Sequence, residues 1–434
     1  MKKNIIIFGG LLLLFLSPTN STADTTPYGY PIKDPYAATV VGTPPKYQAN
    51  LPKNIRLKTM KLDVFKNRTI PDIFWYDEKF EYSLAYQKKK APLIFIIAGT
   101  GASYQSSKML ILQKAFFKAG FHVVSISSPT YENFIITASN THVPGNIADD
   151  AKDLYHLMEL IRNQIKHFIK ISEFYLTGYS LGGFQAAFVT RLDEKKGSFN
   201  FNKVLMINPP VSMYNSVEIL DKMLINNIPK GPDGLNDLYE ELLHKFIKFY
   251  KHTNHVYLDR NFLYSAYKEI RPDNSNLAAL VGVSFRFSST NMIFTSDVMS
   301  NAGFIVPKNT VLSPYDSLTD YFKVTLQVSF MDYFDKLLYP YLKSKNPDCT
   351  KQEVIDLMSL KSIENYLIAT KKISLVTNAD DLILLPGDIS YLSEVFGDRA
   401  KIYPWGGHCG NIGYKSNIEY MINYFQIKDN RHGE

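Results

Sequence analysis

One serine occupies a sequence setting that suits a nucleophile. Ser180 is the centre of Gly178-Tyr179-Ser180-Leu181-Gly182, which follows the apolar segment 174–176 and opens a segment of helical pattern over 181–192. In a G-x-S-x-G turn between a strand and a helix, the strained backbone lifts the serine hydroxyl above the sheet, and the glycines leave room for that backbone. A glycine-rich packing turn is the alternative interpretation. The strand before the turn and the helix after it favour a catalytic serine.

A histidine and two aspartates further along the chain supply the groups that such a serine needs. His408 lies in the sequence GGHCGN at 406–411, where small neighbours leave its imidazole free to approach a serine. Asp380 and Asp381 directly follow the apolar segment 373–376. Both sites fit the chain order nucleophile, acid, histidine. We favour Asp381 as the acid, and Asp380 is the alternative.

Backbone amides on two loops are expected to bind the oxyanion of a tetrahedral intermediate. One donor is the residue after the nucleophile, Leu181, and the other lies after the third strand, where Thr100 is favoured and Gly101 is the alternative. Gly99-Thr100-Gly101 also suits a dinucleotide-binding loop. That interpretation fails because Tyr104 stands where the third glycine belongs and no acidic residue ends the next strand, at 125–129.

Metal ions, other cofactors and nucleic acid are not expected. His244, His252 and His255 lie near one another, but no carboxylate or cysteine pattern completes a metal site. The net charge of +7 comes from 48 basic and 41 acidic residues, a balance too small and scattered to predict nucleic-acid binding. Lysine runs at 88–90 and 371–372 are interpreted as solvated ends of elements. A weak attraction to anionic lipid surfaces is the alternative.

The elements that must position these residues alternate between short apolar runs and helical patterns. Two segments of alternating polarity predict antiparallel strands at a sheet edge, and the apolar runs predict strands buried on both faces. Strands that alternate with helices predict a parallel sheet flanked by helices. Asp388 is interpreted as the N-cap of a further helix. The predicted strands are 55–65, 73–87, 93–98, 122–126, 174–176, 204–207, 373–376 and 400–403, and the predicted helices are 108–118, 147–167, 181–192 and 417–425.

The interval between the sixth and seventh strands is far longer than an ordinary connection. Residues 211–370 therefore predict a large, mainly helical cap inserted into a core formed by 51–210 and 371–434. The apolar clusters at 281–287 and 292–304 are interpreted as the cap's own core. The alternatives are that they line an acyl pocket or contact a membrane surface. Helical patterns in the cap cover 218–225, 235–250, 262–270, 321–342 and 351–370.

The first 50 residues are expected to contribute little to the packed fold. Residues 1–23 combine Lys2 and Lys3, an apolar stretch and small residues, which predicts a cleaved secretory signal peptide, with an uncleaved anchor as the alternative. Residues 24–50, rich in Pro, Thr and Tyr, predict an extended lead-in. In an exported protein Cys349 and Cys409 allow one disulfide, a pairing that the sequence leaves open because it gives no distance between them.

Taken together, the motifs resemble those of the α/β-hydrolase superfamily. The resemblance covers roughly 90–210 and 370–427 and rests on AGTGAS at 98–103, GYSLGG at 178–183, NADD at 378–381 and GGHCGN at 406–411. More narrowly, SPTYENF at 128–134 and YPWGGHCGN at 403–411 look like a group of exported proteobacterial hydrolases of poorly defined substrate. The resemblance implies a triad of Ser180, His408 and Asp381 that works through an acyl-enzyme. The sequence departs from the His-Gly opening of many lipases, because Ala98-Gly99 stands there.

The sequence thus predicts an exported, periplasmic or secreted serine hydrolase that cleaves carboxylic esters. The large apolar cap favours a bulky, lipid or long-acyl ester, with peripheral membrane contact through the cap as an open possibility. A peptidase, thioesterase or acyltransferase would use the same residues. The competing hypothesis is an inactive binding or scaffolding protein on a hydrolase fold, in which Ser180 would be buried without access. The oligomeric state is not readable from the sequence.

Overall fold

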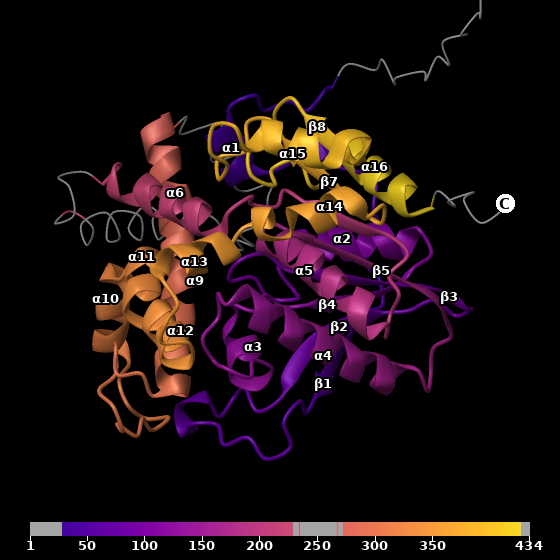
Figure 1. Cartoon of the computed structure of the whole chain (residues 1–434). Coiled ribbons are helices and arrows are strands. Elements are labelled where there is room, and N and C mark those ends of the chain that lie inside the picture. Colours follow the sequence, from indigo (N-terminus) through magenta and orange to yellow (C-terminus); the bar gives the residue numbers. More distant parts are fainter. Residues whose placement is uncertain (1–27, 229–233, 235–266, 268–271, 427–434) are drawn as a thin grey trace, which may run out of the picture.

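A mostly parallel sheet of eight strands forms the centre of the protein. The computed structural model describes residues 28–228, 234, 267 and 272–426 (Figure 1). The strand order is β1-β2-β4-β3-β5-β6-β7-β8. β2 runs antiparallel to both of its neighbours, and the other strands are parallel. The strands are β1 (Lys58–Leu62), β2 (Phe80–Ala85), β3 (Ala91–Ile97), β4 (His122–Ile126), β5 (Ile171–Tyr179), β6 (Val204–Ile207), β7 (Ile373–Asn378) and β8 (Ala400–Tyr403).

The predicted strand 73–87 is wrong in its first half. Asp72–Phe74 is a turn of 3-10 helix, η2, and the strand begins only at Phe80. Ile73 and Phe74 are both buried, and the Phe74 ring meets the ring of Phe294 edge to face at 6.3 Å. Two adjacent apolar residues buried on one tight turn had mimicked the apolar content of a strand.

Helices cover both faces of the sheet, so the strands are buried from both sides as their apolar runs predict. The helices α2 (Ser107–Lys118) and α16 (Lys415–Gln426) pack in one apolar cluster on one face. The helices α4 (Ile147–Ile165), α5 (Leu181–Lys196) and α15 (Asp388–Phe396) contribute to a second cluster on the other face, and the short α3 (Glu132–Thr137) joins them. The η6 turn (Gly397–Arg399) leads from α15 into β8.

The insertion between β6 and β7 is helical, as predicted, and most of its helices lie along one side of the molecule, at the left of Figure 1. The predicted helix 235–250, the predicted helix 262–270 apart from Tyr267, and the histidines at 244, 252 and 255 lie outside the described residues. The described helices are α6 (Met213–Ile225), α9 (Asn274–Ser300), α10 (Thr319–Gln327), α11 (Phe330–Tyr333), the π-helix η4 (Phe334–Leu338), α12 (Tyr339–Lys345), α13 (Lys351–Leu357), η5 (Leu360–Ile363) and α14 (Glu364–Ala369).

The predicted helix 321–342 is interrupted. α10 ends at Gln327, and Ser329 starts the next helix with a capping box in which its side chain and that of Asp332 each accept the other's backbone N–H. Ser329 therefore ends one helical pattern and begins another. The predicted helix 351–370 is likewise divided into α13, η5 and α14.

The longest helix, α9, comprises the apolar clusters 281–287 and most of 292–304, and no single helix is evident there in the sequence pattern. Among the described residues α9 alone has the length and apolarity to cross a membrane, and 67% of its most apolar window is buried in the protein. A buried ion pair fixes it to α6, since Arg286 donates to Asp221 at 3.0 Å. Most of the two clusters therefore forms the cap's own core, as the sequence favours.

The prediction of an extended lead-in over 24–50 is wrong for its described part. Pro35–Val41 forms α1, and Pro45–Tyr47 forms the 3-10 turn η1. Asp34 caps α1 through a 2.7 Å bond from the Ala37 N–H, and Pro35 occupies the first helical position. These start signals were present in the sequence, but the surrounding Pro and Thr residues masked them. The proposed signal segment 1–23 lies outside the described residues.

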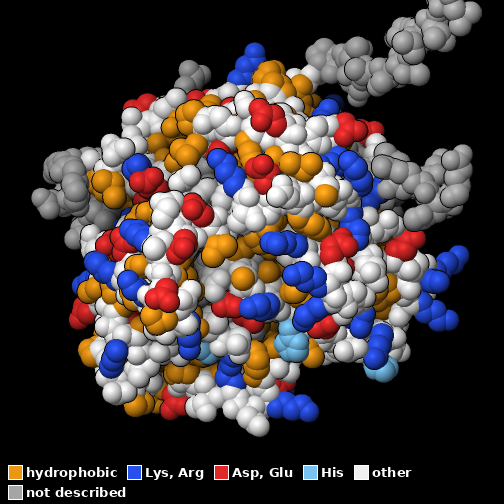
Figure 2. Space-filling view, in the orientation of Figure 1, with side chains coloured by type: hydrophobic (Ala, Val, Ile, Leu, Met, Phe, Trp, Pro, Cys, Tyr) orange, Lys and Arg blue, Asp and Glu red, His pale blue; other side chains and the backbone are white. Residues whose placement is uncertain are grey.

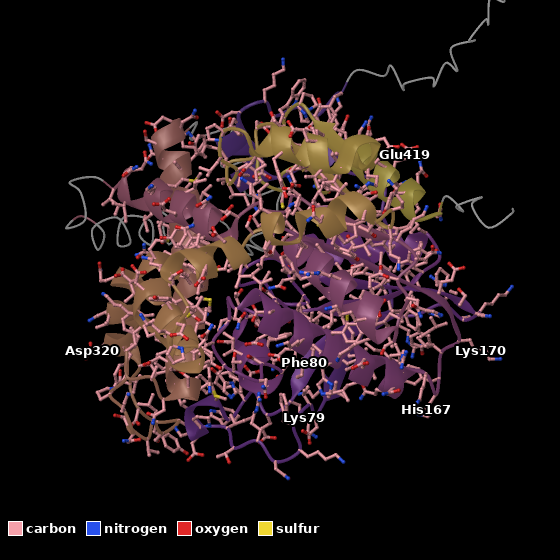
Figure 3. All side chains as sticks on the ribbon, in the orientation of Figure 1. Lys79, Phe80, His167, Lys170, Asp320 and Glu419 are labelled. Carbon is pink, nitrogen blue, oxygen red and sulfur yellow. The ribbon has the colours of Figure 1, made fainter. Side chains whose placement is uncertain are left out.

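Neighbouring side chains can differ sharply in burial, as two residues labelled in Figure 3 illustrate. Phe80 at the start of β2 is fully buried, while its neighbour Lys79 is exposed. Asp320 in α10 and Lys170 before β5 lie at opposite sides of the molecule in Figure 3. The cap and the turn between α4 and β5 are therefore far apart, and the carboxyl ends of the central strands face the cap side (Figure 1).

Candidate active site

Ser180 stands at the sharp turn between β5 and α5. Its backbone has φ 54° and ψ −125°, a conformation that is uncommon for a residue with a side chain. Its N–H donates to the Ile207 carbonyl at 2.8 Å, which fixes the turn to β6. Ser180 as a residue is partly exposed. This is the strained strand-to-helix turn that the motif predicts.

Two glycines of the turn are sterically required. A Cβ on Gly182 would lie 2.2 Å from the Ile97 carbonyl oxygen, and one on Gly178 would lie 2.4 Å from the Gly182 carbonyl carbon. No side chain fits at such distances without a backbone shift. The glycines therefore do allow close packing, and the same packing forces Ser180 into its raised position.

Ser180, His408 and Asp381 are joined by hydrogen bonds. His408 Nε2 lies 2.9 Å from the Ser180 Oγ, and His408 Nδ1 lies 2.9 Å from Asp381 Oδ1 and 3.1 Å from Oδ2. Three loops, after β5, β7 and β8, supply the three groups. The structure thus brings the three residues favoured by the sequence into the arrangement that serine hydrolases use.

Asp380 has a different place. Its carboxylate accepts the Gly406 N–H at 3.1 Å and the Gly407 N–H at 2.9 Å. Burial raises the pKa of this carboxyl, and the two amide bonds oppose that rise. Asp380 therefore holds the start of the histidine loop, which we define as residues 403–414, and Asp381 contacts the imidazole.

Asn208, just after β6, is a site residue that the sequence analysis missed. Its side-chain N–H donates to Asp381 Oδ2 at 2.8 Å, and its own φ is 45°. Asp381 Oδ1 also accepts the Ile383 N–H at 3.3 Å. A buried carboxylate with several donors keeps a fixed orientation. The signal available in the sequence was an asparagine at a strand end, before Pro209, which alone does not point to an acid 173 residues away.

The proton on His408 is held strongly. Burial lowers the pKa of His408, but the charge of Asp381, the charge of Cys409 and the hydrogen bonds to both residues together outweigh burial, so the pKa rises from 6.5 to about 10. Cys409 Sγ lies 3.8 Å from His408 Nε2. The charge of Asp381 therefore stabilises the imidazolium, the form that a general base reaches when it has taken a proton.

The loop after β3 is pinned beside Ser180. A Cβ on Gly99 would lie 3.2 Å from the Ser180 Cβ, so the loop backbone is in contact with the nucleophile's turn. The Gly101 N–H is occupied, because it donates to the Thr130 hydroxyl at 2.8 Å. For the amides of Thr100 and Leu181 no acceptor is assigned within the described part of the chain. This favours Thr100 over Gly101 as the partner of Leu181.

The histidine loop is held by the N-terminal segment. The His408 N–H donates to the Thr39 hydroxyl at 2.8 Å, and that hydroxyl donates to the Pro35 carbonyl at 2.7 Å. A Cβ on Gly407 would lie 2.2 Å from the same carbonyl oxygen. Further bonds join Thr43 to Gly410 at 2.9 Å and the Trp405 indole to the Tyr30 carbonyl at 2.8 Å. The segment predicted to be a lead-in thus directly supports the backbone of the histidine loop.

A hollow of about 200 Å³ lies beside the loop after β3. Gly101 and Thr130 form one wall, and Phe287 and Ser288 of α9 form another, with Glu132 also at its lining. Phe287 is 51% exposed. Burial, and next the charge of Asp77, raise the pKa of the Glu132 carboxyl. The cap helix therefore reaches the edge of the candidate site, and one apolar side chain of the cluster 281–287 faces this hollow.

Other sequence expectations have mixed outcomes. Asp388 is not an N-cap: Gly387 holds that position, and the Asp388 carboxylate accepts the Leu385 N–H at 2.9 Å. Asp388 instead closes the turn before α15. Cys349 and Cys409 are free cysteines. No group of three or more His, Cys, Asp or Glu side chains that could hold a metal ion occurs within the described residues.

Comparison with known proteins gives structural neighbours only. No family model and no curated protein sequence matches the chain. A Legionella pneumophila protein provisionally described as a hydrolase shares 12% identity over 92% of this chain and 95% of its own, with a TM-score of 0.44. Carboxyl esterase 2 of Tuber melanosporum shares 14% over 87% and 88% (TM-score 0.40), and an esterase of Rhizomucor miehei shares 12% over 90% and 87% (TM-score 0.42).

Identities this low and TM-scores below 0.5 say nothing about a substrate. The chain's own topology is more informative. It has a mostly parallel sheet with an antiparallel second strand, a strained serine turn after β5, and an acid and a histidine after β7 and β8. By this arrangement the protein has the α/β-hydrolase fold.

Proposed function

We propose that the protein is an exported serine hydrolase that cleaves carboxylic esters. The observation that carries the proposal is the unbroken path from the Ser180 Oγ through both nitrogens of His408 to Asp381, with 2.9 Å at each step. The position of a partly exposed Ser180 at a strained turn is the second support.

The geometry supports a two-stage reaction. His408 Nε2 takes the Ser180 proton while Oγ bonds to the ester carbonyl carbon, and the amides of Thr100 and Leu181 bind the resulting oxyanion. Collapse of the intermediate breaks the bond to the alcohol oxygen, which takes the proton from His408. Water then attacks the acyl-enzyme by the same path and releases the acid. Asp381 orients the imidazole and stabilises its charge throughout.

We further propose a bulky or long-acyl ester as the substrate, because the cap places Phe287 at the hollow beside Gly101. A lipid ester fits this proposal, and peripheral membrane contact through the cap would bring the enzyme to it. If esters are not cleaved in the assays below, cleavage of amides would indicate a peptidase and cleavage of thioesters a thioesterase. Transfer of the acyl group to an alcohol would indicate an acyltransferase.

The first test is labelling of the protein from Asp24 onward with a fluorophosphonate probe, read by intact mass, with Ser180→Ala as the control. Stoichiometric labelling that the variant loses is expected, and a chain-length series of esters then ranks substrates. A folded protein that takes no label would favour the inactive scaffold instead. The partly exposed Ser180 and its hydrogen-bonded histidine argue against that scaffold.

Export is proposed from the sequence of residues 1–23. Expression of the full chain in a Gram-negative host, followed by N-terminal sequencing of the periplasmic and secreted fractions, tests it. A new N-terminus near Asp24 is expected. Full-length protein retained in the membrane fraction would indicate the uncleaved anchor.

A further inference from the structure

A second cavity lies at the seam between the sheet's helices and the cap. It has a volume of about 350 Å³ and is bounded by α4 and α5 on one side and by α12 and α13 on the other. We call it the seam cavity. In Figure 2, hydrophobic side chains on the face between α5 and α13 are bordered by charged side chains of both signs. Its apolar walls include Ile147, Phe188, Leu342, Val354, Leu357 and Met358.

The ionised side chains that line the seam cavity are cations. Arg191 and Lys345 both line it, and no Asp or Glu belongs to its lining. Within the described residues no hydrogen bond or ion pair is assigned to Arg191. The Lys345 Nζ lies 5.6 Å above the ring of Tyr341. An apolar interior with a positive rim complements a molecule that has one apolar chain and an anionic head.

Two of the carboxylates near the cavity already have partners, and a third, Glu364, lines a neighbouring hollow together with Arg191. Asp149, which follows the lining residue Ala148, accepts from Lys152 at 2.9 Å and from the Asn146 amide at 2.6 Å. Glu194, one turn beyond Arg191 on α5, pairs with Lys372 at 2.9 Å. The positive charge of the rim is thus not neutralised by a direct ion pair with either group.

We propose that the seam cavity binds a free fatty carboxylate of a single chain. Its volume is at the lower end of the range for small-molecule sites, which suits one chain and excludes lipids with two. The site is separate from the candidate active site, because Arg191 follows Ser180 by eleven residues along α5, about 16 Å at the helical rise. The proposal does not depend on the proposed function.

The occupied cavity would bridge the core and the cap. The chain contacts Phe188 of α5 and Leu342 of α12, and the carboxylate meets Arg191 and Lys345. A ligand that binds only the folded protein raises the midpoint of thermal unfolding, and the stabilisation grows with the logarithm of the ratio of free ligand concentration to Kd once that ratio exceeds one. Fatty carboxylates are therefore expected to stabilise the attachment of the cap as well as to bind.

Equilibrium dialysis with radiolabelled dodecanoate, below its micellar concentration, tests the proposal on the whole protein. Arg191→Ala is expected to weaken binding about tenfold, as the loss of a charge-assisted contact should. Lys195→Ala, a change of another exposed cation on α5 outside the lining, is the matched control and should leave the affinity within about twofold. Dodecanol should bind about tenfold more weakly than dodecanoate.

A second pair of variants locates the chain. Leu357 lines the seam cavity and is 64% exposed, whereas Phe287 lines the hollow beside Gly101 and is 51% exposed. Both can therefore be changed to Asp at little cost to the core. Leu357→Asp should abolish dodecanoate binding and its thermal stabilisation, and Phe287→Asp should change neither. The reverse pattern would place the ligand in the active site, and equal affinity for dodecanol and dodecanoate would overturn the role of the cations.

Discussion

The Ser180 Oγ and the His408 Nε2 lie 2.9 Å apart, yet the two residues are held in place by different parts of the chain. The serine turn is built from residues 178–183 and from the backbones of β3 and β6, which lie against its glycines. The histidine loop is held by the distant segment 28–49 and by Asp380. The bond from His408 to Thr39 joins residues 369 positions apart. One half of the site is therefore specified locally, and the other half depends on the assembly of the chain's two ends.

The largest effect is expected from a change inside the local half. Gly182→Ala puts a Cβ 2.2 Å from the Ile97 carbonyl oxygen, so the turn must open and Ser180 must leave its place. We expect fluorophosphonate labelling to fall by about 10³-fold, with a destabilisation of about 3 kcal/mol. Labelling kinetics and urea unfolding measure both.

Gly387→Ala is the control for that change, because Gly387 has φ 94° with no atom within 4 Å of an added Cβ. It should cost stability through backbone strain alone and leave labelling nearly unchanged. Equal losses of labelling in the two variants would mean that steric contact at the turn is not what positions the serine.

The two aspartates separate orientation of the imidazole from support of its loop. Asp381→Asn removes the charge that faces His408 Nδ1 and should lower kcat about 10³- to 10⁴-fold. Asp380→Asn weakens only the bonds from the Gly406 and Gly407 amides and should lower kcat about tenfold. Steady-state kinetics on a chromogenic ester decide. A larger loss in the Asp380 variant would exchange the two roles.

The raised pKa of His408 predicts how activity depends on pH. The base must be neutral to accept the serine proton, so the labelling rate should climb with pH towards the His408 pKa of about 10. In Asp381→Asn that climb should end at lower pH, because the charge that raises the pKa is gone. The stability of the folded protein should change with pH in the opposite direction. A folded-state pKa above 6.5 stabilises the protein fully below pH 6.5, and the contribution is lost as the pH rises towards 10.

Labelling rates and urea unfolding between pH 6 and 10 measure the two trends in parallel. An Asp381→Asn profile that keeps the wild-type midpoint would show that the carboxylate does not set the histidine's pKa.

The smallest effect is expected at the remote support of the histidine. Thr39→Val keeps the shape of the side chain but leaves the His408 N–H without its acceptor. We expect kcat to fall on the order of tenfold with KM unchanged, and stability to fall by about 1 kcal/mol. Thr39→Ser keeps the hydroxyl and should restore most of the activity. A loss that Ser does not restore would assign Thr39 a packing role only.

The contrast between the locally built serine turn and the distantly supported histidine loop also explains which features could be predicted from the sequence. The six strands β3 to β8 were placed because buried parallel strands leave short apolar runs, whereas β2 was placed only in its second half. Ser180, Asp381 and His408 stood out because glycines and strand ends mark them. Asn208 and Thr39 did not stand out, since each acts through one bond to a residue far along the chain. The helix α9 was missed because its buried face carries Arg286, Ser289, Thr290 and Asp297, whose polarity hides the helical period.

The contact between the segment 28–49 and the histidine loop has a consequence for the order of folding. Ala49 donates to the Gly413 carbonyl, and Gln48 pairs with Tyr414 across a short antiparallel bridge, so this support closes a loop that contains almost the whole protein. Contacts of such sequence separation form late, after their closure entropy has been offset by other packing. During synthesis the serine turn can be native while the histidine still lacks its support. The triad would then be completed in a late folding step, only after residues 403–414 have been synthesised and have met the segment 28–49.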